Sequence, residues 1–240
     1  NDTVLATGGI GQLYLHTTNP ASACADGQAM ALRAGAQLES LEFVQFHPTA
    51  LACGADPAPL VTEALRGAGA ALIGEGGRRI MQSVHRDGDL APRDVVAHAV
   101  WTQVRGGRRV WLDATGIMAA DESAFPQVRA LCLAHGIDPA RDPIPVMPAA
   151  HYHMGGVAVD VDGHSSLPGL WACGEAACSR ARPTERSRRG LAPGQCASAR
   201  RARVKWNAGR SRGAVHPGFT PEARAPSAAR KSALRARGRA

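Results

Sequence analysis

The stretch TVLATGG, residues 3–9, decides the fold that we expect for this chain. Its first four residues are apolar or β-branched, which predicts a buried parallel strand, and the glycines after Thr7 predict a tight turn where that strand ends. A glycine turn lets the backbone come close to a ligand, so this turn is a candidate binding loop. Asp26 and Gly27 then open a helix that should continue to about Arg33.

Further strands and helices follow as far as Cys173, so the fold class that we expect is α/β. Pro92 suits the first turn of a helix, and Gly136 suits a helix end. We expect strands at 41–46 and 110–113, a hairpin at 71–80 turning at 74–77, and a second hairpin from 155–160 to 170–173 turning at Asp162 and Gly163; helices are expected at 62–67, 92–104 and 125–135.

The charge of the chain divides sharply by position. The whole sequence of 240 residues carries a formal net charge of +8, which would suit a nucleic-acid partner. Residues 1–178 hold 11 Arg and no Lys against 18 acidic residues, whereas residues 179–240 hold 15 Arg and 2 Lys against 2 Glu. The basic character therefore belongs to the last part of the chain alone.

The cysteines and the hydropathy pattern favour a cytoplasmic protein. The six cysteines form no CxxC pair, and a chain of this length does not need a disulfide framework, so we interpret them as free thiols. No apolar run approaches the roughly 18 residues that a membrane span needs. We expect no membrane partner.

Four short polar clusters combine His, Arg or Thr with small or strand-forming residues, which is the composition of a pocket that binds an anion. They are EFVQFHPT at 42–49, TEALRG at 62–67, PRD at 92–94 and HYHMGG at 151–156.

Three histidines in these clusters have ordinary interpretations as well as functional ones. His47 follows the strand expected at 41–46 and precedes Pro48, which favours an extended conformation before it. Ligand-binding groups often emerge at strand ends, although a lone His there is more often structural. His151 and His153 should share one face of an extended segment, but no Cys, Asp or Glu nearby completes a ligand set. We therefore predict no metal site.

Three charged side chains stand on the helices expected in the middle of the sequence. Glu63 and Arg66 lie three residues apart on one helix face, where a surface ion pair is the simplest interpretation. Arg93 lies in a first helical turn beside Pro92 and Asp94, where the carboxylate suits the helix dipole and the guanidinium does not. An Arg in that position indicates a role outside the helix.

Taken together, the four clusters resemble the L-aspartate oxidase family, within the succinate dehydrogenase and fumarate reductase flavoprotein superfamily. The resemblance runs from about Thr3 to Cys178, with the motifs in the family's order and with similar spacing. It implies part of a discontinuous Rossmann-like FAD-binding domain at 1–47 and 151–178. Residues 48–150 would form an inserted α+β capping domain.

The resemblance also implies roles for particular residues. His47, Thr62 and His151 would bind the two carboxylates of the substrate, and cationic His and Arg side chains would hold them by charge. Arg93 would be catalytic, passing a proton to or from the substrate. A guanidinium pKa above about 12 leaves two interpretations open: desolvation lowers that pKa, or Arg93 acts as an electrostatic clamp.

The cofactor implied by the resemblance is FAD. Its binding residues would be Thr7, Gly8, Gly9, Asp26, Gly27, Gly155, Gly156 and Glu175. Residues 67–72 begin like a GxGxxG phosphate loop, but they lack the third glycine and follow a helix, so we do not assign a phosphate site there. The family's own loop is expected upstream of Asn1, which makes the chain look like a fragment that is inactive alone.

Residues 179–240 depart from the family pattern and form the last expected segment. Arg, Ala, Ser, Gly and Pro make up 46 of these 62 residues, which predicts a disordered basic tail. The family instead continues into Asn- and Arg-containing stretches that complete the flavin and substrate sites. We favour a frameshift near Cys178 over a genuine nucleic-acid-binding tail, because aromatic residues for base stacking are few.

The function that follows is FAD-dependent oxidation of L-aspartate to iminoaspartate, which begins NAD synthesis in bacteria, with oxygen or fumarate accepting the electrons. One alternative is a fumarate reductase or succinate dehydrogenase flavoprotein, acting on dicarboxylates without nitrogen. The other is a non-enzymatic fragment with a basic tail. The sequence leaves the oligomeric state open.

Overall fold

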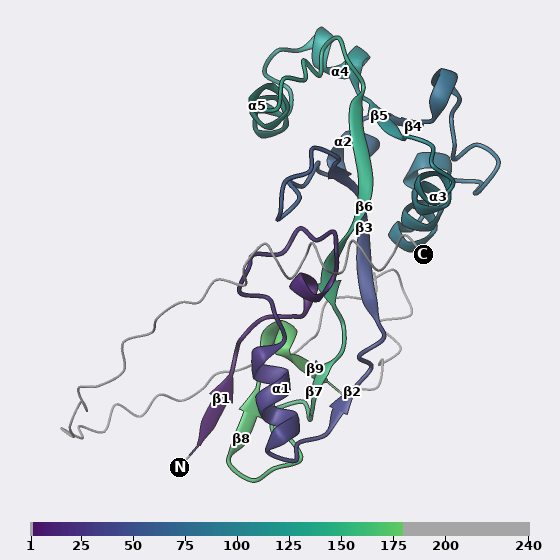
Figure 1. The fold of residues 1–240 in the computed structure, drawn as a ribbon. Helices are drawn as coiled ribbons and strands as arrows, with labels where there is room; N and C mark the ends of the chain where they lie inside the picture. Colours follow the sequence, from purple (N-terminus) through teal and green to yellow (C-terminus); the bar gives the residue numbers. More distant parts are fainter. Residues whose placement is uncertain (1, 180–240) are drawn as a thin grey trace. The chain divides into compact units, whose positions relative to one another are not determined.

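The structure is a computed structural model that describes residues 2–179, and these residues belong to one compact unit (Figure 1). The strands are β1 (Thr3–Leu5), β2 (Leu38–Glu39), β3 (Val44–Leu51), β4 (Ala71–Ile73), β5 (Trp111–Asp113), β6 (Ile144–His153), β7 (Gly156–Val159), β8 (Leu170–Ala172) and β9 (Ala177–Ser179). The helices are α1 (Asp26–Arg33), α2 (Ala64–Gly67), α3 (Arg93–Arg105), α4 (Thr115–Ala120) and α5 (Pro126–Ala134), with short 3-10 turns η1 (Gly11–Leu13), η2 (Glu75–Gly77), η3 (Gly88–Leu90) and η4 (Gly174–Ala176).

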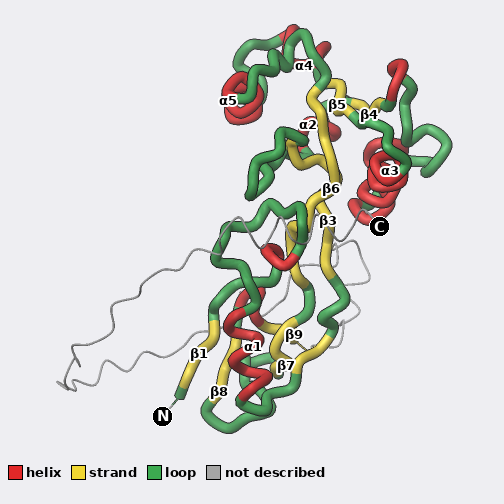
Figure 2. The backbone as a smooth tube through the Cα atoms, in the orientation of Figure 1, coloured by secondary structure: helices red, strands yellow, loops and turns green. Residues whose placement is uncertain are grey.

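Three sheets organise the described strands (Figure 2). The parallel pair β1–β8 and the mixed sheet β2–β7–β9 lie beside α1, while β3, β6, β5 and β4 form an antiparallel sheet in that order. Helix α3 packs against both β3 and β6. The expected mixture of α and β elements is confirmed.

The buried apolar side chains form two main clusters that use different parts of the chain. The larger lies within residues 51–146 and includes Leu72, Val100 and Leu112, all fully buried. The smaller packs Ala31 of α1 against Val157 and Ala172. This division runs close to the expected boundaries at 47 and 151, although the division into domains itself stays a prediction.

The longest ladder, β3 with β6, contains two irregularities that matter for the site. Gln45 pairs with Tyr152 but Phe46 pairs with Ala150, so His151 is an extra residue on β6. His47 pairs with Ala149 and Ala50 with Met147, so two residues of β3, Pro48 and Thr49, stand opposite one residue of β6. Such β-bulges redirect side chains, and they tolerate proline because the ladder is already interrupted.

This ladder corrects our prediction for the strand at residues 41–46. The strand begins at Val44 and runs through His47 and Pro48 to Leu51, so His47 lies inside a strand rather than at its end. The bulge at Pro48 explains the error, because it lets a proline stand where a regular ladder would exclude it.

Two other predictions fail in part. The first strand is parallel as expected but not buried, since Val4 is 58% exposed and β1 pairs with β8 alone among the described strands. The hairpin expected from 155–160 to 170–173 does not form. Single bridges of Ser165 to Val159 and of His164 to Trp171 put an irregular segment between β7 and β8, and β8 pairs with β1 instead.

The chain after Cys178 begins inside the fold. Ser179, where we expected the tail to start, is the last residue of β9 and pairs with Val159. The rest of the tail, residues 180–240, lies outside the described residues, and its predicted disorder and frameshift stay predictions.

Candidate functional site

The bulged ladder brings His47 and His151 together. Their ring centroids are 5.2 Å apart with the rings 65° to each other, an edge-to-face contact. His47 is 2% exposed, whereas His151 is partly buried. His47 pairs with Ala149, and His151, the extra residue on β6, follows two residues further along that strand, which brings the two rings into diagonal contact.

A hydrogen-bonded chain of charges lies beside the two imidazoles. Arg93 at the start of α3 donates from Nε to Glu63 Oε2 at 2.6 Å and from Nη1 to Gln45 Oε1 at 3.1 Å. The other carboxylate oxygen of Glu63 accepts from Arg66 Nη2 at 2.8 Å. The pair Glu63–Arg66 is thus no simple surface ion pair, because the Arg66 side chain is 1% exposed and the carboxylate also holds Arg93.

Thr62 is attached to the same region through its neighbour. Thr49, two residues after His47, donates its hydroxyl to Val61 O at 3.0 Å and accepts from Val61 N–H on its backbone O. These two bonds hold the segment before α2 against β3. The Thr62 hydroxyl accepts from Ala64 N–H at 3.3 Å. The structure therefore brings together His47, His151 and Arg93, and holds Thr62 next to the segment that joins them.

The electrostatics contradict the expectation of cationic histidines. Burial lowers the pKa of His47 to about 3, helped by repulsion from His151 when that ring is protonated and by the positive charges of Arg93 and Arg66. Burial and the charge of Arg93 also lower the pKa of His151. Both imidazoles are therefore neutral near pH 7, and the permanent positive charge comes from the guanidinium groups. Burial lowers the pKa of Arg66 too, while Glu63 opposes that shift.

The residues expected at the cofactor gather where β1 and β8 end. The two strands are parallel with Leu5 beside Ala172, so Thr7 to Gly9 and Glu175 leave the same edge of the sheet. Such an edge is the usual ligand site of a parallel sheet. Burial raises the pKa of Glu175, although its carboxylate accepts the His153 backbone N–H at 2.6 Å, which opposes the rise.

Four of the expected glycines serve close packing within this cluster. A Cβ on Gly9 would overlap the Glu175 carboxylate, and one on Gly27 would overlap the Thr7 hydroxyl. A Cβ on Gly155 or Gly156 would overlap the backbone of a neighbouring segment. Asp26 accepts a hydrogen bond from the Cys24 thiol at 3.1 Å.

Gly8 behaves differently and provides the test of fit for a cofactor. Its φ is +79°, and an added Cβ would meet no atom within 4 Å. Open space therefore remains beside the backbone of the turn at Gly8. Backbone, hydroxyl and carboxylate groups at the carboxyl edge of parallel strands fit a nucleotide cofactor.

His153, for which we predicted no function, lies in the same cluster. It is 2% exposed, its Nδ1 lies 3.2 Å from Gln28 Nε2, and its Nε2 lies 3.3 Å from Leu41 O. Burial lowers its pKa, opposed by Leu41 O. The bulge at His151 separates the two histidines that strict alternation would put on one face.

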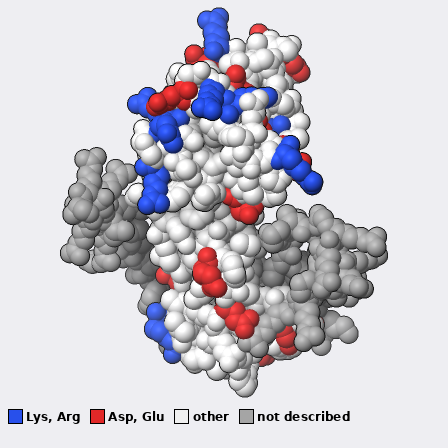
Figure 3. Space-filling view, turned by 90° about the vertical axis from the view of Figure 1, so that its right-hand side faces the viewer, with Lys and Arg blue, Asp and Glu red and all other residues white. Residues whose placement is uncertain are grey.

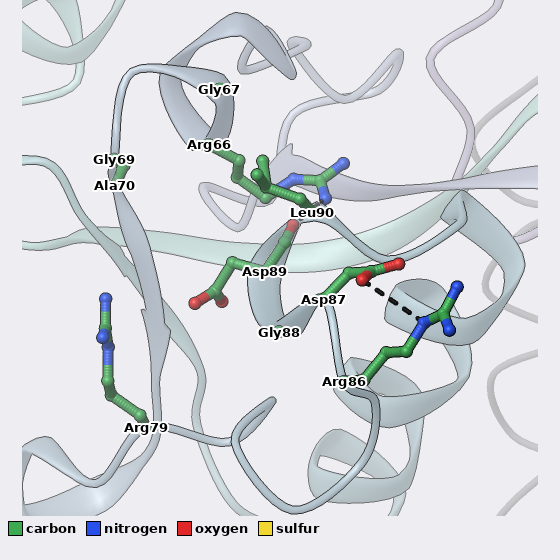
Figure 4. Close-up of a pocket in the computed structure, with 10 residues that line it drawn as sticks. All are labelled: Arg66, Gly67, Gly69, Ala70, Arg79, Arg86, Asp87, Gly88, Asp89 and Leu90. Atoms are coloured by element: carbon green, nitrogen blue, oxygen red, sulfur yellow. Dashed lines mark hydrogen bonds and ion pairs between the residues drawn. The ribbon is translucent and has the colours of Figure 1, made fainter.

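The hollow drawn in Figure 4 is a separate feature. It has a volume of about 340 Å³ and is lined by Arg66, residues 67–70 in part, Arg79 and residues 86–90. Arg66 contributes to it, but His47, His151 and Arg93 do not. On the face in Figure 3, Arg side chains stand among acidic ones, so this face of the described chain has no single-sign basic stripe of the kind that nucleic acid needs.

Sequence reasoning missed several polar contacts of the site. Thr18 Oγ1 lies 2.8 Å from His151 Nδ1, and Asn19 Nδ2 donates to His151 O at 2.9 Å. Gln45 lies within a cluster that we singled out, but its contact with Arg93 had no local signal. Thr18 and His151 are 133 residues apart, and no periodicity reports a contact across that separation.

Comparison with known proteins assigns this geometry to a family. The family described as FAD binding domain matches residues 1–188.

The chain belongs to the FAD binding domain family.

Curated relatives of this FAD binding domain are L-aspartate oxidases. That of Mesorhizobium japonicum is 55% identical over 177 residues, which is 73% of this chain and 34% of the relative. That of Streptomyces coelicolor is 51% identical over 182 residues, covering 73% and 31%. The chain spans about a third of the length of the curated relatives that it matches.

Solved structures similar to this FAD binding domain include a quinol fumarate reductase and an Sdh1. A mutant E. coli quinol fumarate reductase is 34% identical with a TM-score of 0.68, covering 75% of this chain and 34% of that chain. The Mycobacterium smegmatis Sdh1 structure with UQ1 is 38% identical with a TM-score of 0.59, covering 73% and 31%. The FAD-binding part of the predicted fold and the predicted cofactor, FAD, are confirmed at the level of the family, and the capping domain stays a prediction. None of the described helices is long and apolar enough to cross a membrane.

Proposed function

We propose that this chain carries the dicarboxylate site of an FAD-dependent L-aspartate oxidase, which converts L-aspartate to iminoaspartate at the start of bacterial NAD synthesis. The observation that carries the proposal is the meeting of His47, His151 and Arg93 beside the cluster around Glu175. The identity of 51–55% to curated L-aspartate oxidases supports the choice of substrate. We place the enzyme in the cytoplasm, with oxygen or fumarate as electron acceptor.

In this proposal each residue acts through its observed partners. His47 and His151 donate N–H groups to substrate carboxylates, and Arg93 supplies a planar cationic fork that Glu63 and Gln45 hold in place. Thr62 adds a neutral hydroxyl at the start of α2. Orientation and preorganised charge of this kind are the main contributions that side chains make to such a reaction. FAD, when bound, supplies the two-electron acceptor, and Thr7, Gly8 and Glu175 would line its site.

Arg93 also stands where a proton must be handled when the substrate is oxidised. Its Nε–H is bonded to Glu63 at 2.6 Å, and Glu63 is bonded in turn to Arg66. Of our two interpretations of Arg93, the contacts favour the electrostatic clamp, because Glu63 and Gln45 hold the fork and a carboxylate at this distance stabilises the charged guanidinium. The roles of His47, Thr62, Arg93 and His151 remain proposals.

A second candidate is a fumarate reductase or succinate dehydrogenase flavoprotein, because the similar solved structures include both kinds of enzyme. Identities of 34–38% to those structures favour it less than the curated oxidases favour the first candidate. A non-enzymatic basic module would depend on residues 180–240, outside the described part of the chain.

The test is anaerobic bleaching of the flavin in the complete gene product. L-aspartate should bleach the flavin, and succinate and L-asparagine should not, because succinate lacks the amine and L-asparagine lacks one carboxylate. Bleaching by succinate but not by L-aspartate would select the second candidate. A yellow protein whose flavin is bleached by neither L-aspartate nor succinate would refute the dicarboxylate site altogether.

A further inference from the structure

We propose that Thr18 is a positioning residue that fixes the tautomer of His151, so that both imidazoles of the site present an Nε2–H donor to the substrate. The substrate in this statement rests on the proposed function. The tautomer itself rests only on the contacts of the described residues.

The segment before α1 is bound firmly to the bulge that carries His151. Thr17 Oγ1 and Thr18 N–H both donate to Ala150 O, at 2.9 Å and 3.0 Å, and Ala150 N–H donates to His16 O at 2.9 Å. Asn19 Nδ2 donates to His151 O at 2.9 Å. Four hydrogen bonds therefore hold Thr18 against the bulge, and its side chain has little freedom to leave the imidazole.

The direction of the Thr18–His151 hydrogen bond follows from the donors available. Thr18 Oγ1 lies 2.8 Å from Nδ1 of the ring, and among residues 2–179 it has no other hydrogen-bond partner. A hydroxyl carries one proton that needs an acceptor, and the unprotonated nitrogen of a neutral imidazole is one. In our proposal Thr18 is the donor and Nδ1 the acceptor, which leaves the proton of His151 on Nε2.

His47 reaches the same tautomer by a different route. The Thr49 backbone N–H points to His47 Nδ1 at 3.3 Å. A backbone N–H is a donor only, so Nδ1 must be an acceptor and Nε2 carries the proton. The hydroxyl of Thr49 also lies 3.4 Å from His47 Nδ1, but its proton goes to Val61 O at 3.0 Å.

Nε2–H donors on both His47 and His151 would determine the orientation in which the substrate binds. Carboxylate oxygens accept from both, whereas an ammonium group has no lone pair to offer either ring. If His151 carried its proton on Nδ1 instead, its Nε2 lone pair would attract the ammonium of L-aspartate and allow the reversed orientation. Thr18 would thus exclude a binding mode in which the amine, rather than a carboxylate, faces β6.

The experiment compares the complete gene product with Thr18→Val and Thr18→Ser. In protein with ¹⁵N-labelled histidine and no substrate, the His151 ring should show an unprotonated Nδ1 and a protonated Nε2, with the signals assigned by their loss in His151→Asn. Thr18→Val should give a mixture of the two His151 tautomers and lower kcat/KM for L-aspartate about tenfold, the value of one hydrogen bond. Thr18→Ser, which keeps the hydroxyl, should retain the single tautomer and the original kcat/KM. The matched control is Thr102→Val, which removes a hydroxyl bonded to His98 O on the exposed face of α3. It should change neither the His151 tautomer nor kcat/KM.

A protonated Nδ1 on His151 in the unsubstituted protein would overturn the proposal, and so would a tautomer that Thr18→Val leaves unchanged. If Thr18→Val does not fold, as judged by circular dichroism, the unsubstituted spectrum and Thr18→Ser still decide. Since the spectra need no substrate, a correct tautomer in a protein that does not oxidise L-aspartate would refute the proposed function and leave the role of Thr18 standing.

Discussion

Acidification from pH 7 to pH 5 should lower the free energy of unfolding by about 2 kcal/mol through His47 alone. The pKa of His47 falls from 6.5 to about 3 on folding because its ring is buried among positive groups. Below pH 6.5 the unfolded chain takes up a proton that the folded chain does not, so stability is complete above that pH and is lost down to about pH 3. Each pH unit in this range costs about 1.4 kcal/mol. His151 and His153, whose pKa values are also lowered, add loss of the same sign.

The assay is urea unfolding of the purified protein at several pH values between 7 and 5, with His47→Asn beside the unsubstituted chain. The variant should lose about 2 kcal/mol less over this range, because Asn does not titrate. His98→Asn is the control, since the His98 side chain is exposed on α3 and meets water whether or not the chain is folded. Parallel curves for the unsubstituted chain and His47→Asn would refute the reasoning, whatever their absolute stability.

Three further predictions concern packing and charge. Gly27→Ala should destabilise the protein by about 1–3 kcal/mol in urea unfolding, because the new Cβ overlaps the Thr7 side chain, while Gly67→Ala, with open space around it, should be neutral or stabilising. Arg93→Lys should lower kcat in the complete gene product roughly 100-fold or more with bound FAD unchanged, because Lys keeps the charge but loses the fork; equal losses would make Arg93 structural. Glu63→Gln should cost about 2 kcal/mol of stability, since it leaves the buried Arg66 without its carboxylate, and an unchanged urea midpoint would contradict this.

The elements with strong local punctuation could be predicted from the sequence. Helix α3 begins after Pro92 and α5 ends before Gly136, as the fixed φ of proline and the positive φ of glycine lead one to expect. The strand expected at 110–113 is confirmed as β5 (Trp111–Asp113), which begins one residue later than expected. Such features depend on a few neighbouring residues, so they can be predicted from a single sequence.

Features that depend on pairing partners could not be predicted. A proline looked like a strand end at Pro48, but β6 supplies a bulge that accommodates it. Regular apolar runs around Gly163 looked like a hairpin, but β8 finds a better partner in β1. The meeting of His47 and His151 came from the family resemblance, and the neutral state of both rings came only from their burial in the folded chain.

The extra residue at His151 also links the chemistry of the chain to its tolerance of insertions and deletions. Removing His151 would end the first of the two irregularities in the β3–β6 ladder and leave the one at Pro48 and Thr49, and a more regular ladder costs less than a bulged one. The same deletion would remove the second imidazole and with it the partner of the Thr18 hydroxyl. Selection for stability and selection for activity therefore act in opposite directions on the length of β6, and we expect variants selected for heat resistance alone to lose this residue before they lose any residue of the core.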